Sequence, residues 1–342
     1  MRKVYALMST ASQTAISVDA PGKVNLYLAV GDVRPDGYHP LTTLFAAVSL
    51  TETITVSEGV APGLSLSMDI VPGSLVDQQM QAGQFDPAAV PMDERNLVYR
   101  AAELILAEHG IDSAPALHLH IAKAVPVAGG MAGGSADAAA ALIATDRYLH
   151  ATGRTGALLT QTDYECLAAQ LGADIPFSVC AALGQTLALG QGTGTELQNV
   201  AAPQEPLHLV IVAAQFGLST PSVFKQLDAG RTSGLYPASG ELVEPVELLE
   251  ALNSYDGSEA ALASLAPLLR NDLQAPALSC APQLEQTLNL RDSEGVYASL
   301  VSGSGPTVLL LTSSQAQAET LASALRNTGN HAVSAVIEVL YH

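Results

Sequence analysis

The stretch Pro126-Val-Ala-Gly-Gly-Met-Ala-Gly-Gly-Ser-Ala-Asp137 runs directly into an alanine-rich segment, 138–149, that is predicted to be helical. Its four glycines leave the backbone free to adopt positive φ and to approach a ligand closely, and Ser135 is predicted to cap the helix. Amides at a helix start, together with the helix dipole, favour an anion there. The stretch therefore predicts a phosphate-binding loop, with a flexible Gly/Ala hinge as the alternative.

Two common nucleotide-binding patterns are absent from the sequence. It contains no Gly-x-x-x-x-Gly-Lys-Ser/Thr, and no Gly-x-Gly-x-x-Gly in the loop opens a βαβ unit with an acidic residue at the dinucleotide spacing. The loop is thus predicted to bind the phosphates of a nucleotide without being a Walker A loop or a dinucleotide fingerprint.

Composition indicates a globular protein. A chain of 342 residues that is 48% hydrophobic can bury a large core and suggests two domains. A net charge of −19 argues against nucleic acid or an anionic membrane surface as a partner. A phosphate ligand would then need a binding site that differs locally from this negative surface. Backbone amides, a few cations and Mg²⁺ would form it. Lysines are scarce enough to be informative, and Lys23 and Lys123 both lie near glycine-rich or apolar segments.

The sequence also predicts a cytoplasmic location. The apolar stretch 4–8 is too short for a signal peptide, and no apolar run approaches the length of a membrane span. Cys166, Cys180 and Cys280 lack the spacing of a metal site or a disulfide framework. We expect them to behave as small core hydrophobes in a reducing compartment.

Periodicity predicts an α+β fold, because strands and helices do not alternate as βαβ units. We expect domains at 1–200 and 201–342, and a surface loop through most of 59–93. Strands are predicted at 14–19, 23–31, 41–50, 52–57, 64–71, 116–122, 207–214, 296–301, 307–312 and 331–340. Helices are predicted at 96–109, 138–149, 162–171, 221–227, 245–252, 257–269, 282–290 and 315–327, and residues 174–177 are expected to break the helical pattern.

A second glycine cluster, Val301-Ser-Gly-Ser-Gly-Pro-Thr307, lies between two predicted strands. A hairpin turn would use the same residues for conformational reasons. Taken with the first loop, the cluster predicts a second wall of one site. Its glycines permit close backbone approach, and its hydroxyls and amides are donors for a polyphosphate.

Lys23 and Asp174 are the candidates for chemistry, because phosphoryl transfer to an alcohol needs positioning, charge neutralisation and an acceptor for the hydroxyl proton. Lys23 follows Pro-Gly at the start of an apolar strand, although a solvated lysine packed on a sheet would fit the same pattern. Asp174 fits a turn or helix end equally well when taken alone. Beside Lys23 its carboxylate would stay ionised and could accept a proton.

Three separated segments resemble the GHMP small-molecule kinases: Ala20-Pro-Gly-Lys-Val-Asn-Leu26, the loop 126–135, and Ser302-Gly-Ser-Gly-Pro-Thr307. Their order and spacing agree with that family over nearly the whole chain. The resemblance implies a two-domain α+β architecture, with a ribosomal-protein-S5-like N-terminal domain, a ferredoxin-like C-terminal domain and the active site in the cleft between them.

Two more segments, Arg34-Pro-Asp-Gly-Tyr-His-Pro-Leu41 and Leu171-Gly-Ala-Asp-Ile-Pro-Phe177, resemble one branch of the family. That branch implies ATP-dependent phosphorylation, with Mg²⁺, of the 2-hydroxyl of a cytidine-diphosphate sugar alcohol in non-mevalonate isoprenoid synthesis. The alternatives are another GHMP kinase, acting on homoserine, mevalonate or a sugar, and a nucleotide-binding regulator without catalysis.

The resemblance also implies roles for individual residues. The catalytic pair would be Lys23 and Asp174. The ATP-binding residues would be Pro126, Val127, Ala128, Gly129, Gly130, Met131, Ala132, Gly133, Gly134, Ser135, Ala136, Asn96, Gly303 and Ser304. The substrate-binding residues would be Asn25, Tyr38, His39, Thr220 and Phe224, with Tyr38, His39 and Phe224 around the cytosine.

The loop departs from the usual family pattern at a few positions. Ala128 and Ala132 replace glycines, and Ala136 stands where a second serine is common. No metal ligands are therefore assigned. Asp137 adds a negative charge in the first helical turn, which suits the helix dipole but would oppose a phosphate unless its side chain points away.

Overall fold

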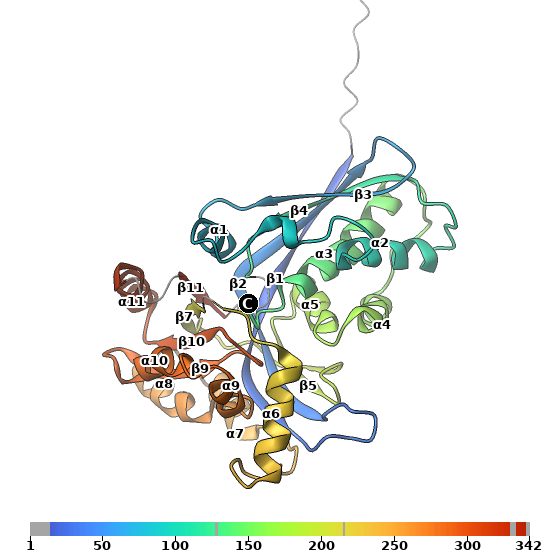
Figure 1. Ribbon diagram of the computed structural model, residues 1–342. Helices are drawn as coiled ribbons and strands as arrows, with labels where there is room; N and C mark the ends of the chain where they lie inside the picture. The colour runs from blue at the N-terminus through green and yellow to red at the C-terminus, as the bar shows by residue number, and fades with distance from the viewer. Residues whose placement is uncertain (1–13, 127–128, 215, 329–332, 340–342) are drawn as a thin grey trace, which may run out of the picture.

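The computed structural model describes residues 14–126, 129–214, 216–328 and 333–339, and it contains two β-sheets flanked by helices (Figure 1). The predicted α+β class is confirmed. The two long strands of the first sheet run through much of the molecule, and the second sheet lies beside one end of them (Figure 1).

The first sheet has the strand order β3-β4-β2-β1-β8, with β5 paired to β2 and β6 to β5. Its strands are β1 (Ala15–Val30), β2 (Leu41–Glu58), β3 (Gly63–Ile70), β4 (Ala116–Lys123), β5 (Leu187–Gln191), β6 (Glu196–Asn199) and β8 (Arg270–Asn271). The expected breaks within 14–31 and within 41–57 are wrong, because each segment is one continuous strand. Shifts of the β1–β2 register absorb the Pro-Gly irregularity between Pro21 and Lys23, and a further shift follows Asn25.

Helices cover the first sheet with small and apolar side chains. They are α2 (Leu97–Glu108), α3 (Gly133–Ala151), α4 (Gln161–Leu171) and α5 (Ile175–Ala182). The alanines of α3 between positions 136 and 144 are buried, which lets the helix pack closely on β1 and β2. The expected end of a helix at residue 171 is confirmed, with Gly172 as its C-cap. A new helix, α5, begins at Ile175, which was not predicted, and Pro176 lies in its first turn, where proline is well tolerated.

The second sheet has the order β11-β7-β10-β9 and is antiparallel throughout. Its strands are β7 (His208–Ala213), β9 (Val296–Val301), β10 (Val308–Thr312) and β11 (Val333–Glu338). The chain from 220 onward also forms α6 (Thr220–Thr232), α7 (Val246–Asn253), α8 (Glu259–Leu265), α9 (Gln274–Cys280), α10 (Leu284–Leu288) and α11 (Gln315–Thr328), with short 3₁₀ helices at Ala266–Leu268 and Asn289–Asp292. Strands β5, β6 and β8 and helix α9 were not predicted from the sequence, and all four are short.

Backbone pairing connects the N-terminal and C-terminal parts of the chain. Strand β8 comes from the C-terminal part of the chain but pairs in parallel with β1, and Val48 of β2 forms a bridge with Val339. The domain boundary near residue 200 stays a prediction.

The 59–93 segment is more than the surface loop that was expected. It contains α1 (Leu75–Gln81) and a 3₁₀ helix, Pro87–Ala89, and α1 contacts β11. Leu75 belongs to a buried hydrophobic cluster, and Val76 is also buried. This insertion therefore packs against the second sheet.

The structure corrects one further sequence expectation. Cys180 is buried, but Cys166 and Cys280 are exposed, so the expectation of three core cysteines is wrong for two of them. Within the described parts of the chain, no helix has the length and apolar character needed to cross a bilayer.

Candidate active site

Lys23 and Asp174 come together from elements far apart in the sequence. The Lys23 Nζ lies 3.4 Å from the Asp174 Oδ2. Lys23 sits at a register shift of β1, and Asp174 is the N-cap residue of α5 but makes no capping bond with its side chain. The lysine side chain is buried and that of the aspartate is 40% exposed. A buried cation thus faces a carboxylate that remains open to a ligand.

Asn25 orients Lys23 through a chain of hydrogen bonds. The Lys23 Nζ donates to the Asn25 Oδ1 at 2.9 Å, and the Asn25 Nδ2 donates to the Thr43 Oγ1 at 2.8 Å. Thr43 then donates to the Tyr27 carbonyl. The Lys23 Nζ also lies 5.3 Å from the centre of the Phe45 ring. These contacts restrict the ammonium group to one side of the sheet.

The glycine loop ends in a helix start that no side chain caps. Ala132, not Ser135, is the N-cap residue of α3, so the sequence prediction of the cap is wrong. Ala132 has φ 56°, the only positive φ of a non-glycine residue in the described ranges. An uncapped helix start leaves amide donors to be satisfied by water or an anion. Val127 and Ala128 lie outside the described residues.

The two glycine clusters form adjoining walls. The Ser302 Oγ donates to the Gly130 carbonyl at 3.1 Å. A Cβ on Gly130 would lie 2.5 Å from the Ser302 carbonyl oxygen, and one on Gly129 would lie 3.1 Å from the Thr307 Oγ1. Gly303, at φ 57°, approaches the Asn25 side chain in the same way. The predicted proximity of the two clusters is confirmed, and at Gly130 it leaves no room for a Cβ.

Beneath the loop, three charged residues form a buried group that we call the phosphate-loop triad: Glu52, Lys123 and Asp137. The Lys123 Nζ contacts the Glu52 Oε1 at 2.5 Å and the Asp137 Oδ2 at 2.6 Å. Glu52 also accepts from the amides of Ala124 and Val125. The triad therefore holds both the chain entering the loop and the first turn of α3. Asp137 points to Lys123, which answers the concern that it would oppose a phosphate.

Burial and mutual charge perturb all three groups. Burial and the neighbouring Asp137 raise the pKa of Glu52 to about 7, despite the opposing effect of Lys123. Burial also raises the pKa of Asp137, against the opposing effect of Lys123. Burial alone would lower the pKa of Lys123, but the two carboxylates outweigh it and raise that pKa. Lys123 was notable in sequence only as one of few lysines, and nothing there indicated Glu52.

A cavity of 320 Å³ adjoins the glycine clusters. Gly129, Pro306 and Thr307 line it from the loops, and Gln84 and Phe85 line it from the 59–93 insertion. The Gln84 Oε1 and the Thr307 Oγ1 are buried without a hydrogen-bond partner. Unpaired buried polar atoms are costly, so the cavity is suited to a ligand with polar groups. Neither Gln84 nor Phe85 was singled out from the sequence.

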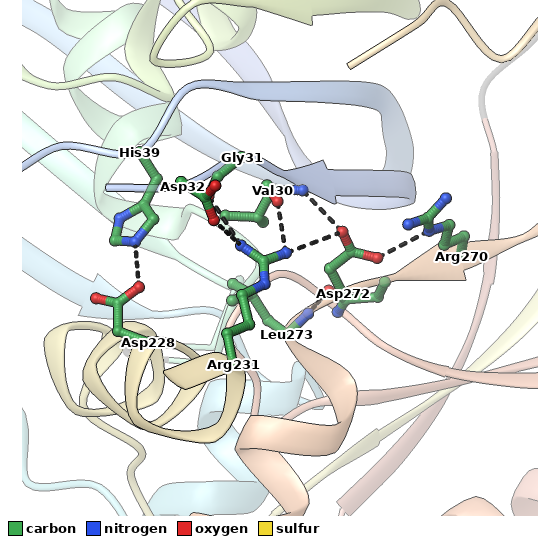
Figure 2. Close-up of polar contacts among 10 residues, drawn as sticks. Val30, Gly31, Asp32, His39, Asp228, Arg231, Arg270, Asp272 and Leu273 are labelled. Atoms are coloured by element: carbon green, nitrogen blue, oxygen red, sulfur yellow. Dashed lines mark hydrogen bonds and ion pairs between the residues drawn. The ribbon is translucent and has the colours of Figure 1, made fainter. Parts of the chain in front are cut away.

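The residues expected around a cytosine lie between the β1–β2 hairpin and α6. The rings of His39 and Phe224 are 4.9 Å apart between centres, and the His39 Nε2 lies 2.8 Å from the Asp228 Oδ1 (Figure 2). Tyr38 is 64% exposed at the hairpin turn. Thr220, at the start of α6, shares a hydrogen bond of 2.7 Å with Ser304 of the second glycine cluster. Asp228 was not found from the sequence.

Asn96 has a structural task in the fold. Its Nδ2 donates to the Pro91 carbonyl, and its Oδ1 accepts from the Val98 amide as the N-cap of α2. The cavity lining does not include it. A contact of Asn96 with adenine stays a prediction.

Family models and known proteins agree with this geometry. The model of the GHMP kinases N terminal domain matches residues 96–182, and that of the GHMP kinases C terminal domain matches 247–331. The chain belongs to the GHMP kinase family and is an ATP-dependent small-molecule kinase.

Relatives place the chain in one branch of that family. It is 42% identical to 4-diphosphocytidyl-2-C-methyl-D-erythritol kinase of Paenarthrobacter aurescens, over 93% of this chain and 92% of the relative. It is 45% identical to the protein of the same name from Mycolicibacterium smegmatis, over 94% and 90%. A crystal structure of 4-(cytidine 5'-diphospho)-2C-methyl-D-erythritol kinase matches with a TM-score of 0.69 and 29% identity, over 94% of this chain and 98% of that one. The chain therefore belongs with these 4-diphosphocytidyl-2-C-methyl-D-erythritol kinases.

Proposed function

We propose that the protein transfers the terminal phosphoryl group of ATP to the 2-hydroxyl of 4-diphosphocytidyl-2-C-methyl-D-erythritol, giving the 2-phosphate and ADP in the non-mevalonate isoprenoid pathway. The observation that carries the proposal is the 3.4 Å pair of Lys23 and Asp174, formed between β1 and the start of α5. The names of the relatives support the substrate.

Asp174 acts as the general base in this proposal. Its carboxylate lies beside a buried lysine and is exposed enough to reach a substrate hydroxyl. It accepts the hydroxyl proton as the oxygen attacks the phosphorus. Lys23, held by Asn25, keeps the carboxylate oriented and offsets negative charge on the transferred group. Asn25 also lies where the sugar alcohol would be bound.

The glycine clusters hold the phosphates of ATP in this proposal. The start of α3 has no side-chain cap, so its amides are available to an anion, and the 302–307 turn lies against the loop at Gly130. The adjoining cavity, with Phe85 and the unpaired Gln84 Oε1, suits the base or ribose of the nucleotide. We place ATP along this surface.

His39 and Phe224 hold the cytosine, with Tyr38 and Thr220 at the edge of the same region. When the His39 Nε2 donates to Asp228, the Nδ1 is left as an acceptor in the neutral ring. An acceptor there matches the exocyclic amino group of cytosine, and the Phe224 face suits stacking with a base.

ATP would enter as its magnesium complex. In the described portion of the chain, no group of three or more His, Cys, Asp and Glu residues could hold a metal ion. The Asp137 Oδ1 is a buried carboxylate oxygen without a partner, but its other oxygen is engaged by Lys123. We therefore assign no metal ligands to the protein itself.

A cytoplasmic location and a small-molecule partner complete the proposal. The free cysteines at 166, 180 and 280 fit a reducing compartment. The net charge of −19 disfavours nucleic acid and anionic membrane surfaces as partners.

An ADP-release assay tests the proposal. Mg-ATP is offered with the cytidine-diphosphate sugar alcohol, homoserine or mevalonate to the parent, to Asp174→Asn and to Asp112→Asn, in which an exposed aspartate is changed. We expect turnover only with the cytidine compound, and a loss of about 10²–10⁴-fold in kcat for Asp174→Asn alone. Turnover that prefers another alcohol would overturn the substrate, and full activity of Asp174→Asn would overturn the base.

A further inference from the structure

Arg231 joins α6 to the end of β1. Its Nη1 donates to the Gly31 carbonyl at 2.9 Å, and its Nη2 donates to the Val30 carbonyl at 2.7 Å (Figure 2). The side chain is only 10% exposed. A guanidinium is a planar fork of donors, so two bonds to consecutive carbonyls fix both its position and its orientation.

Carboxylates surround the same guanidinium. The Asp272 Oδ2 lies 3.8 Å from the Arg231 Nη2 and also accepts from the Val30 amide at 2.9 Å. The Asp272 Oδ1 accepts from the Arg270 Nε at 2.8 Å, and the Asp32 Oδ1 lies 3.8 Å from the Arg231 Nη1 (Figure 2). The last residue of β1 is thus held through its carbonyl by Arg231 and through its amide by Asp272.

The face of α6 that carries Arg231 also carries the residues that we place at the cytosine. Phe224, Asp228 and Arg231 are spaced by four and three residues, which places them along one face of the helix. Phe224 and Asp228 contact His39, at the far end of the 31–40 turn, while Arg231 holds the beginning of that turn. Arg231 therefore fixes α6 relative to the turn that carries His39.

We propose that Arg231, with Asp272, is a positioning residue for cytidine recognition: it sets the separation and angle of the His39 and Phe224 rings. The inference rests on the proposed function. The Nη groups of Arg231 are directed to backbone carbonyls of the protein, so the residue acts through α6 rather than on the substrate. Its loss allows α6 to shift against the turn, whereas the first glycine loop leads into α3, a different element. Thr220 still joins the start of α6 to Ser304 of the second glycine cluster.

The test compares Arg231→Met, Arg231→Lys and Arg291→Met, in which an exposed arginine of the same half of the chain is changed. Calorimetry gives the Kd for ATP and, with a non-hydrolysable ATP analogue saturating, the Kd for CDP. The ADP-release assay gives KM for ATP and for the cytidine substrate.

For Arg231→Met we expect the CDP Kd and the cytidine-substrate KM to rise about 10- to 100-fold, with ATP values within about 2-fold of the parent, because small misplacements of binding groups are costly. Arg231→Lys should be intermediate, since it keeps the charge but loses the fork. Arg291→Met should match the parent.

Equal weakening of CDP and ATP binding would assign Arg231 a general structural role and overturn the inference. Unchanged CDP binding in Arg231→Met would also overturn it, while leaving the proposed function intact. A parent protein that neither binds CDP nor phosphorylates the cytidine compound would overturn the proposed function, and this inference with it.

Discussion

The two ends of the proposed active site are built in different ways. At the phosphate end, the glycine loop is supported by the buried triad of Glu52, Lys123 and Asp137, whose members all belong to the first sheet and the start of α3. At the cytidine end, the contacts of His39 with Asp228, and of Arg231 with the end of β1, connect the first sheet to α6.

Because of this difference, the two ends should contribute differently to the stability of the fold and to the binding of the cytidine substrate. Contacts between charges that are buried within one sheet and its helix form when that part of the chain folds. Removing one of these charges leaves the others uncompensated. Contacts between the hairpin and a helix of the other half depend on how these elements are docked. We expect changes at the phosphate end to affect folding most, and changes at the cytidine end to affect substrate binding most.

The largest expected effect is that of Lys123→Met. Without the ammonium group, Glu52 and Asp137 are buried together with no cation, and the free energy of unfolding should fall by about 3–5 kcal/mol. Urea unfolding at neutral pH measures it. Lys225→Met, on the exposed surface of α6, is the control. A difference between the two variants below about 1 kcal/mol would contradict a structural role of the triad.

Glu52→Gln tests the charge of the triad through pH. The pKa of Glu52 is raised from 4.5 to about 7, so the folded protein retains a proton that the unfolded chain has lost. The stability due to this proton is complete below about pH 4.5 and is lost as the pH rises through about 7, a change of about 3 kcal/mol.

Thermal unfolding of the parent and of Glu52→Gln across this range measures that change. The stability of the parent should fall relative to the variant as the pH rises, because glutamine cannot ionise. Parallel pH profiles would show that Glu52 does not titrate in this window.

At the cytidine end, Asp228→Ala should change binding rather than folding. Without its carboxylate partner the His39 ring is free to turn, and KM for the cytidine substrate should rise about 10-fold, equivalent to about 1.4 kcal/mol. KM for ATP and the urea midpoint should stay near those of the parent and of Glu250→Ala, an exposed change on α7. A matching rise in KM for ATP would remove the distinction between the two ends.

The smallest expected effect is a gain in stability for Ala132→Gly. Ala132 has φ 56°, a conformation that costs an alanine about 1–2 kcal/mol, while glycine adds about 0.5–1 kcal/mol of chain entropy to the unfolded state. The net gain should be about 0.5–1 kcal/mol by urea unfolding. Ala140→Gly, in the middle of α3, should instead lose about 1 kcal/mol. A loss for Ala132→Gly would show that the loop conformation is not strained.

Local sequence patterns predicted most elements but not their irregularities. Alternation and helical spacing located β4, β7, β10, α2 and α11 closely. Pro21 and Gly22 suggested a turn, whereas pairing with β2 keeps the strand intact through a register shift. Ser135 is a good capping residue by type, but the loop enters the helix three residues earlier, with Ala132 in the left-handed region. Partner strands and loop docking decided these points.

The sequence alone determined the site's chemical parts, because glycine density, a scarce lysine and a turn aspartate are local signals of backbone freedom and charge. Lys23, Asp174 and both glycine clusters were identifiable from them, whereas His39 and Phe224 were named only through the resemblance to the GHMP kinases. Only the tertiary structure decided which parts support one another. Glu52 meets Lys123 across 71 positions of sequence and Arg231 meets Val30 across 201, so no local pattern can reveal either contact. Such contacts form when strands pair and helices dock, and the burial that follows perturbs the pKa of the triad and holds the Arg231 fork in place.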